Sequence, residues 1–132
     1  MHEWALAEAV ISAASEAAEK EGLREVTEVR IRVGELQQIE QDVFMFALQQ
    51  IKKDKLESAE FKIEEAQGRM KCRACGHTWI FNKKEFDENV VEAIHFVPEV
   101  AHAYVKCPKC GSPDFDVIEG RGVWLLSVKG VK

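Results

Sequence analysis

Two copies of one short cysteine turn constrain this chain more than any other feature of its sequence. The first copy reads C-R-A-C-G from residue 72, and the second reads C-P-K-C-G from residue 107. Two residues between the cysteines let both sulfurs of a turn face one ion, and the following glycine lets the backbone fold back toward them. The sequence therefore predicts one tetrahedral metal site made by Cys72, Cys75, Cys107 and Cys110.

Zinc is the ion that two such turns favour most. Iron is the rival, because four thiolates in a tetrahedral array also suit it, and the colour of the protein would distinguish the two metals. Free or disulfide-bonded cysteines are the other alternative, which a reducing compartment disfavours. Because four thiolates leave zinc no open position for water, we expect a structural Zn2+ site without hydrolytic chemistry.

The segments on either side of the cysteine region have regular hydrophobic patterns. Residues 3–21 are strong helix formers with an apolar stripe through Leu6, Val10, Ala13 and Ala17, and residues 40–53 have a second helical pattern. Alternation of apolar and charged residues predicts half-buried strands. The expected strands cover residues 26–33, 59–64, 115–118 and 123–128.

These patterns predict an α+β fold with a small sheet packed by two helices and an inserted, loop-rich, zinc-ribbon-like domain. Residues 68–113 contain all four cysteines without a long periodic pattern, so we expect them to form the zinc domain. Residues 1–67 and 114–132 are expected to form the other domain, because the last strand should return to its sheet. The long stretch between the cysteine pairs also allows domain swapping, so we expect a monomer or a homodimer.

The charge balance and the apolar runs exclude several classes of function. The chain has 23 acidic and 18 basic residues, so its net charge repels phosphate backbones and we expect no nucleic-acid partner. No apolar run approaches the ~20 residues that cross a bilayer, and no basic leader precedes Glu3 and Glu8, so we expect a cytoplasmic protein with no membrane partner. We also expect no enzyme, because the sequence shows no Ser/His/Asp set, phosphate-binding loop or open catalytic metal site.

The first residues can form a second kind of metal site. His2 follows the amine of Met1, so the chain offers three nitrogens: the amine, the backbone nitrogen of His2 and its imidazole. This chelate suits a square-planar ion, chiefly nickel or copper, far better than zinc. The backbone nitrogen of Glu3, a carboxylate or another imidazole could take the fourth position. A solvated terminus that binds no metal is the alternative.

The other histidines and two acidic residues are weaker candidates. His95 has apolar neighbours, so it is either a buried, hydrogen-bonded histidine or a further nickel ligand that reaches His2 when the two domains close. His77 and His102 are expected at the surface or beside the cysteine site. Glu40 and Asp42 could lend an oxygen ligand, although an acidic first turn of a helix also explains them.

Four motifs in the same order resemble one known family. They are Met-His-Glu-Trp from residue 1, Val-Gly-Glu-Leu from residue 33, the paired cysteine turns, and Gly-Arg-Gly-Val from residue 120. On these motifs the chain is similar to the HypA family of hydrogenase nickel-insertion accessory proteins, over nearly its whole length. The resemblance implies a nickel-binding α/β domain that holds both termini, with an inserted structural zinc domain.

The resemblance also implies ligands, cargo and partners. It makes His2 the essential Ni2+ ligand, with the Met1 amine and the backbone nitrogens of His2 and Glu3 completing a planar site, and it makes the four cysteines the zinc ligands. The family delivers nickel to the large subunit of nickel-iron hydrogenase together with a HypB-type nucleotide-hydrolysing partner, and some members also serve urease. The competing interpretation is a zinc-ribbon interaction or scaffold module without nickel function.

Overall fold

The computed structural model describes residues 3–37, 39–97 and 101–132, except for the side chains of Lys83 and His95. The described residues divide into two compact units. Unit 1 comprises those within Met1–Val33, Ile39–Glu64 and Val123–Lys132, and unit 2 comprises those within Gly34–Gln38 and Glu65–Gly122. None of the described helices is both long enough and apolar enough to span a bilayer.

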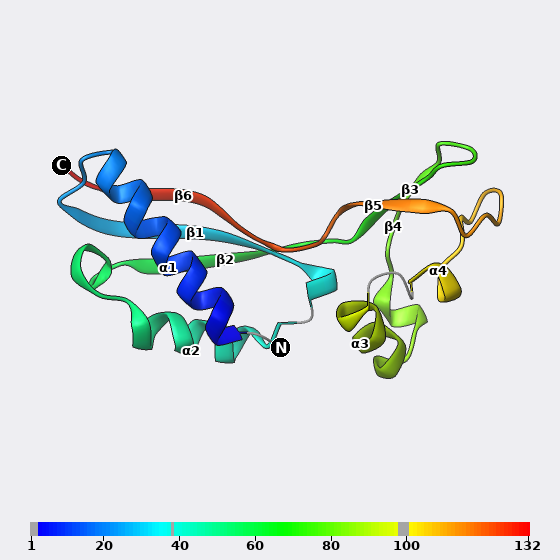
Figure 1. Ribbon diagram of the computed structural model, residues 1–132, viewed down its shortest axis with the longest axis horizontal. Helices are drawn as coiled ribbons and strands as arrows, with labels where there is room; N and C mark the ends of the chain where they lie inside the picture. Colours follow the sequence, from blue (N-terminus) through cyan, green and yellow to red (C-terminus); the bar gives the residue numbers. More distant parts are fainter. Residues whose placement is uncertain (1–2, 38, 98–100) are drawn as a thin grey trace. The chain divides into compact units, whose positions relative to one another are not determined.

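Unit 1 is a three-stranded sheet covered by two helices (Figure 1). Its elements are α1 (Glu3–Lys20), β1 (Glu25–Gly34), α2 (Gln41–Ile51), the 3-10 turn η2 (Asp54–Leu56), β2 (Glu60–Ala66) and β6 (Val123–Val131). The strand order is β2-β1-β6, and β1 pairs with β6 in the antiparallel sense. The predicted return of the last strand to the first sheet is therefore confirmed.

The core of unit 1 lies between its sheet and its helices. The predicted alternation of β1 is confirmed, because Val29, Ile31 and Val33 are buried while Arg30 and Arg32 are exposed. The predicted stripe of α1 is confirmed at Val10 but wrong at Ala13, which is exposed, and Ala17 is only half-buried. The buried residues of this helix are Glu3, Ala7, Val10, Ile11, Ala14 and Ala18. Because alanines occupy 7 of the 18 positions of this helix and lie on all of its sides, the sequence gives little contrast between the faces of the helix.

Unit 2 has a second three-stranded sheet, in the order β4-β3-β5. Its elements are the 3-10 turn η1 (Glu35–Gln37), β3 (Arg69–Cys72), β4 (Thr78–Ile80), the 3-10 turn η3 (Lys83–Glu85), α3 (Glu88–Phe96), α4 (Ala101–Tyr104) and β5 (Phe115–Glu119). A small core around Met70, Phe81 and Phe115 holds it together. The unit is thus more regular than expected, because strands of three or four residues are too short to show a periodic pattern.

One predicted domain boundary differs from the observed division of the chain. The sequence pattern assigns residues 114–122 to the first domain, whereas they lie in unit 2. The reason is that β5 pairs with β3, with Cys72 opposite Phe115 and Met70 opposite Val117. The overall α+β class, with two helices on a small sheet and an inserted second unit, is confirmed.

Two glycine motifs meet within unit 2. The Gly34 amide donates a hydrogen bond to the Gly122 carbonyl oxygen at 2.8 Å, and the Leu36 amide donates one to Gly120 at 2.9 Å. A Cβ atom at Gly34 would lie 2.2 Å from the Gly120 carbonyl oxygen, and one at Gly120 would lie 2.4 Å from the Cα of Gly68. Only glycine allows the backbones to approach this closely, which explains the glycines in the Val-Gly-Glu-Leu and Gly-Arg-Gly-Val segments.

Replacement of Phe44 by alanine tests the core of unit 1, and Phe46 on the same helix provides the control. Phe44 is fully buried, whereas 58% of Phe46 is exposed. We expect Phe44→Ala to lower the free energy of unfolding by about 3–5 kcal/mol, since it leaves a cavity. Phe46→Ala should lower it by about 1 kcal/mol or less. Urea denaturation followed by circular dichroism measures both, and equal losses would contradict this description of the core.

Candidate metal centre

The two cysteine turns have the same backbone geometry. The Gly76 amide donates to the Cys72 carbonyl oxygen at 3.0 Å, and the Gly111 amide donates to the Cys107 carbonyl oxygen at 2.8 Å. Both glycines are in the left-handed region, with φ of 77° at Gly76 and 76° at Gly111. A Cβ atom at either position would meet nothing within 4 Å. Glycine is therefore favoured there by the left-handed backbone conformation and not by a lack of space.

The four sulfurs of these turns gather in one cluster, in which all of them lie within 4.8 Å of one another. The sulfur of Cys72 is 3.5 Å from that of Cys110, and the sulfur of Cys75 is 3.7 Å from that of Cys107. Tetrahedral zinc with Zn–S bonds of about 2.3 Å places its sulfurs about 3.8 Å apart. A disulfide requires about 2.05 Å, so these distances fit a shared ion and not disulfide bonds.

Backbone amides aim at the sulfurs and stabilise their charged form. Burial raises the pKa of the Cys107 thiol, but the amides of Cys110 and Lys109 lower it to about 7. The Ser112 amide lowers the pKa of Cys110, yet the neighbouring sulfurs, chiefly that of Cys72, and burial raise it to about 12. Crowded thiols thus compete for negative charge, and a bound cation would allow all four to ionise.

An ion-pair cluster joins the first turn to the strand that follows the second. The Arg73 side chain donates to Asp114 at 3.3 Å and to Asp116 at 3.1 Å, with a second, shorter contact to Asp116. Hydrogen bonding to Arg73 holds the pKa of the Asp116 carboxyl below its usual range, although burial opposes this. No sequence pattern predicts this cluster, and the acidic residues soon after the second turn are the signal that could have indicated it.

The histidines near the cysteine site do not join the sulfur cluster. The Nδ1 atom of His102 is 2.7 Å from the Pro113 carbonyl oxygen, and its ring lies 4.3 Å from that of Phe115. The ring of His77 stacks on Trp79, at an interplanar angle of 11°. Both histidines therefore lie beside the cysteine turns and pack against the sheet of unit 2.

The predicted nickel ligands are only partly visible. Met1 and His2 lie outside the described residues, and His95 belongs to α3 but its side chain is also outside them. Glu3 is buried at the start of α1. Burial opposes ionisation of its carboxyl group, but hydrogen bonds with the backbone at Glu3 and at Glu40 help to lower its pKa. The starts of α1 and α2 therefore lie together, and this places Glu40, a weaker ligand candidate, beside Glu3.

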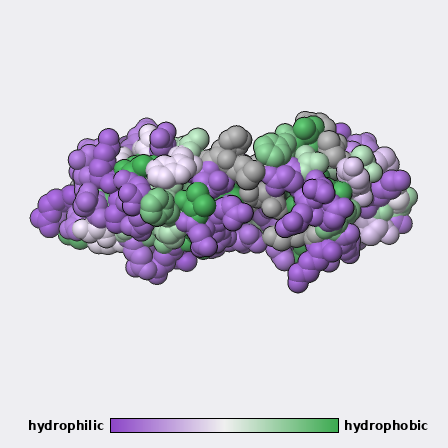
Figure 2. Space-filling model, turned by 90° about the horizontal axis from the view of Figure 1, so that it is seen from below, coloured by the Kyte–Doolittle hydropathy of each residue, from purple (hydrophilic) through white to green (hydrophobic). Residues whose placement is uncertain are grey.

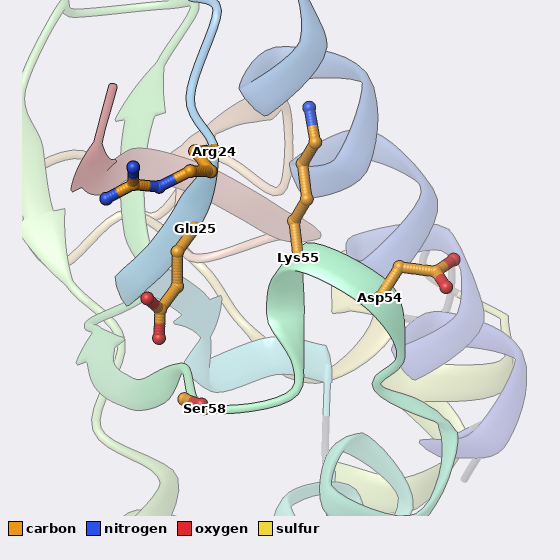
Figure 3. A pocket seen from close by; sticks show the side chains of 5 residues that line it. All are labelled: Arg24, Glu25, Asp54, Lys55 and Ser58. Carbon is orange, nitrogen blue, oxygen red and sulfur yellow. The ribbon is translucent and has the colours of Figure 1, made fainter.

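A shallow depression in unit 1 is not a convincing site. It has a volume of about 500 Å³ and is lined by Arg24, Glu25, Asp54, Lys55 and Ser58. Figure 3 shows that the long side chains among them point in different directions and do not converge. The Lys55 amine forms an ion pair at 2.7 Å with Glu19, which is not part of the lining. The charges at this place therefore do not define a ligand.

Relatives with similar sequences cover almost the whole chain. The hydrogenase maturation factor HypA of Thermococcus gammatolerans is 47% identical over 131 residues, which cover 97% of this chain and 94% of that protein. The protein of the same name from Pyrococcus furiosus is 44% identical, with the same coverage of both chains.

A solved structure and a family profile agree with these relatives. The solution structure of the Ni metallochaperone HypA from Helicobacter pylori matches with a TM-score of 0.68, over 99% of this chain and 98% of that one. At 20% identity, this match shows a common fold. A family profile matches residues 1–130, and its description reads "Hydrogenase/urease nickel incorporation, metallochaperone, hypA". The chain therefore belongs to the HypA family.

Proposed function

We propose that this protein is a nickel metallochaperone that binds Ni2+ at its N-terminus and delivers it during maturation of a nickel-iron hydrogenase. The observation that carries this proposal is the family match over residues 1–130, which includes the Met-His-Glu start. The family is described as a metallochaperone, and delivery of an ion requires binding and exchange but no catalytic turnover. The alternative is a zinc-ribbon scaffold without nickel function.

The proposed nickel ligands are the amine of Met1, the backbone nitrogen and imidazole of His2, and the backbone nitrogen of Glu3. Glu3 is the first residue of α1, and the first four N–H groups of a helix have no partner within it. The Glu3 nitrogen can therefore release its amide proton to water and bind nickel without breaking a helical hydrogen bond. His95 is proposed as a further nickel ligand.

The proposed resident metal is a structural zinc ion at Cys72, Cys75, Cys107 and Cys110. Sulfur distances near those of a tetrahedral zinc site and amides aimed at the sulfurs support it. Iron suits the same ligands and remains the alternative. The ion would join the strand that ends at the first turn to the segment that starts at the second, so zinc binding contributes to the folding of unit 2.

The proposed partners are a HypB-type nucleotide-hydrolysing protein and the large subunit of the hydrogenase, and the proposed location is the cytoplasm. The relatives are named hydrogenase maturation factors, and this name supports the hydrogenase as a partner. A planar nickel site leaves its two axial positions open to incoming ligands of the recipient. Transfer by stepwise ligand exchange is therefore possible without first releasing a free ion.

Nickel titration of zinc-loaded protein with its native start tests the N-terminal chelate. We expect about one nickel ion per chain, with an absorption band of square-planar geometry, because four nitrogens in a plane suit this ion. His2→Ala should lose the site, and so should a variant with Gly-Ser-Gly-Ser added before Met1, because the amine is then too far along the chain from His2 to share one planar chelate with it. His102→Ala, at a histidine held by Pro113, is the control and should bind as the wild type does. Equal binding by all four proteins would favour the scaffold alternative.

Substitution of Gly76 tests whether the shape of the turn matters for zinc. We expect Gly76→Val to cost about 1–2 kcal/mol, since a β-branched residue disfavours positive φ, and so to weaken zinc binding by roughly tenfold. Ala74→Val lies in the same turn, at an exposed position, and should leave zinc binding within about twofold. Competition with a chromogenic chelator measures both affinities. An equal effect of the two substitutions would contradict the role of the left-handed glycine.

A further inference from the structure

Three apolar side chains form an exposed patch where α1 and α2 begin, and we call Trp4, Val43 and Phe46 the aromatic patch. The exposed fractions are 45% for Trp4, 40% for Val43 and 58% for Phe46. The rings of Trp4 and Phe46 meet edge to face, with centroids 6.2 Å apart. In Figure 2, hydrophobic side chains gather among hydrophilic ones on the face of unit 1 that α2 occupies. Isolated exposed apolar residues are ordinary, but a contiguous group marks an interaction surface.

The core of unit 1 does not need these side chains. On α2, Phe44, Ala47 and Leu48 are buried and fill the space above the sheet. Val43 and Phe46 are three positions apart, so they lie together on another side of this helix. Trp4 is one residue from the buried Glu3, yet its own ring is half exposed. The patch is therefore apolar for a reason other than packing of the core.

Charged residues of one sign surround the aromatic patch. Glu8 is exposed in the second turn of α1, Asp42 is exposed in the first turn of α2, and Glu40 is exposed directly before α2. Residues 3–19 and 40–51 contain no lysine and no arginine. A partner for this surface must therefore have an apolar centre surrounded by lysine or arginine.

We propose that the aromatic patch docks the protein that exchanges nickel with the N-terminal chelate, and that this partner presents an apolar surface with a basic rim. The inference rests on the proposed function, because Trp4 directly follows the proposed ligands Met1, His2 and Glu3. A partner seated on the patch brings its own ligands to the metal. It also covers the ion from water during the exchange, and both effects favour direct transfer.

The acidic rim also argues against other occupants of the patch. A second copy of this chain would place one acidic rim against another in a symmetric dimer, which like-charge repulsion disfavours. Nucleic acid and anionic lipid surfaces are repelled for the same reason. A basic partner is instead attracted over a distance, so its association should slow as the salt concentration rises.

Binding of purified partners to nickel-loaded, zinc-loaded full-length chain tests the proposal. The probes are the HypB-type protein and the hydrogenase large subunit from the same organism, each measured by calorimetry. We expect Phe46→Ser and Asp42→Lys to weaken binding of at least one probe by about tenfold or more, since exposed aromatic anchors dominate such interfaces. Leu126→Ser is the control. Leu126 is 39% exposed on β6 of the same unit, and this variant should bind both probes as the wild type does. Phe46→Ser and Leu126→Ser should keep the nickel affinity of the wild type, and Asp42→Lys, which changes a candidate oxygen ligand, is compared at saturating nickel.

Several outcomes would overturn the proposal. It is wrong if Phe46→Ser and Asp42→Lys bind both probes as tightly as the wild type, or if the wild type binds nickel but neither probe. It is also wrong if light scattering shows a wild-type dimer that Phe46→Ser converts to a monomer, since a second copy then covers the patch. If the wild type fails to bind nickel, the proposed function is wrong. The docking surface is then tested without nickel, and it is supported if Phe46→Ser binds a probe more weakly than the wild type does.

Discussion

The antiparallel pairing of β3 with β5 determines where the four sulfurs meet. The first cysteine turn begins at the end of β3, and β5 begins shortly after the second turn. The register places Cys72 opposite Phe115, so the two turns lie side by side. Arg73 strengthens the arrangement, because its side chain reaches Asp114 and Asp116 across the same pair of strands. The cysteine cluster is thus a consequence of strand register as much as of the turns themselves.

The two proposed metal sites differ in how much of them a sequence can reveal. The N-terminal chelate uses consecutive residues, so its chemistry can be read without any knowledge of the fold. Each cysteine turn is also local, and its glycine at positive φ follows from the spacing. The meeting of the two turns is not local. The sequence predicts that the turns meet only because a metal site needs four thiolates. Of the two strands that bring the turns together, β3 is not predicted, and β5 is predicted but assigned to the other domain.

The same distinction explains the rest of the fold. The elements α1, α2, β1 and β6 were predictable, because each is long enough for its hydrophobic period to appear. The nine-residue helix α3 was missed, although Asp87 caps it by accepting a hydrogen bond from the Val90 amide at 3.0 Å. The Arg73 cluster joins residues about 40 positions apart by way of the strand register. No local pattern encodes such a contact.

The proposed nickel site lies at the start of a helix, where the electrostatic potential is unfavourable for a cation, and the acidic residues of unit 1 offset this potential. The N-terminus of a helix has a partial positive charge of about half an elementary charge, which disfavours a dication. The starts of α1 and α2 lie together, so the N-terminus of α2 adds to this effect. The ionised Glu3 carboxylate, buried at this place, offsets it, and the exposed Glu40 and Asp42 add to the negative potential. A dication is then tolerated without being trapped by a carboxylate cage, and this balance suits an ion that has to be handed on.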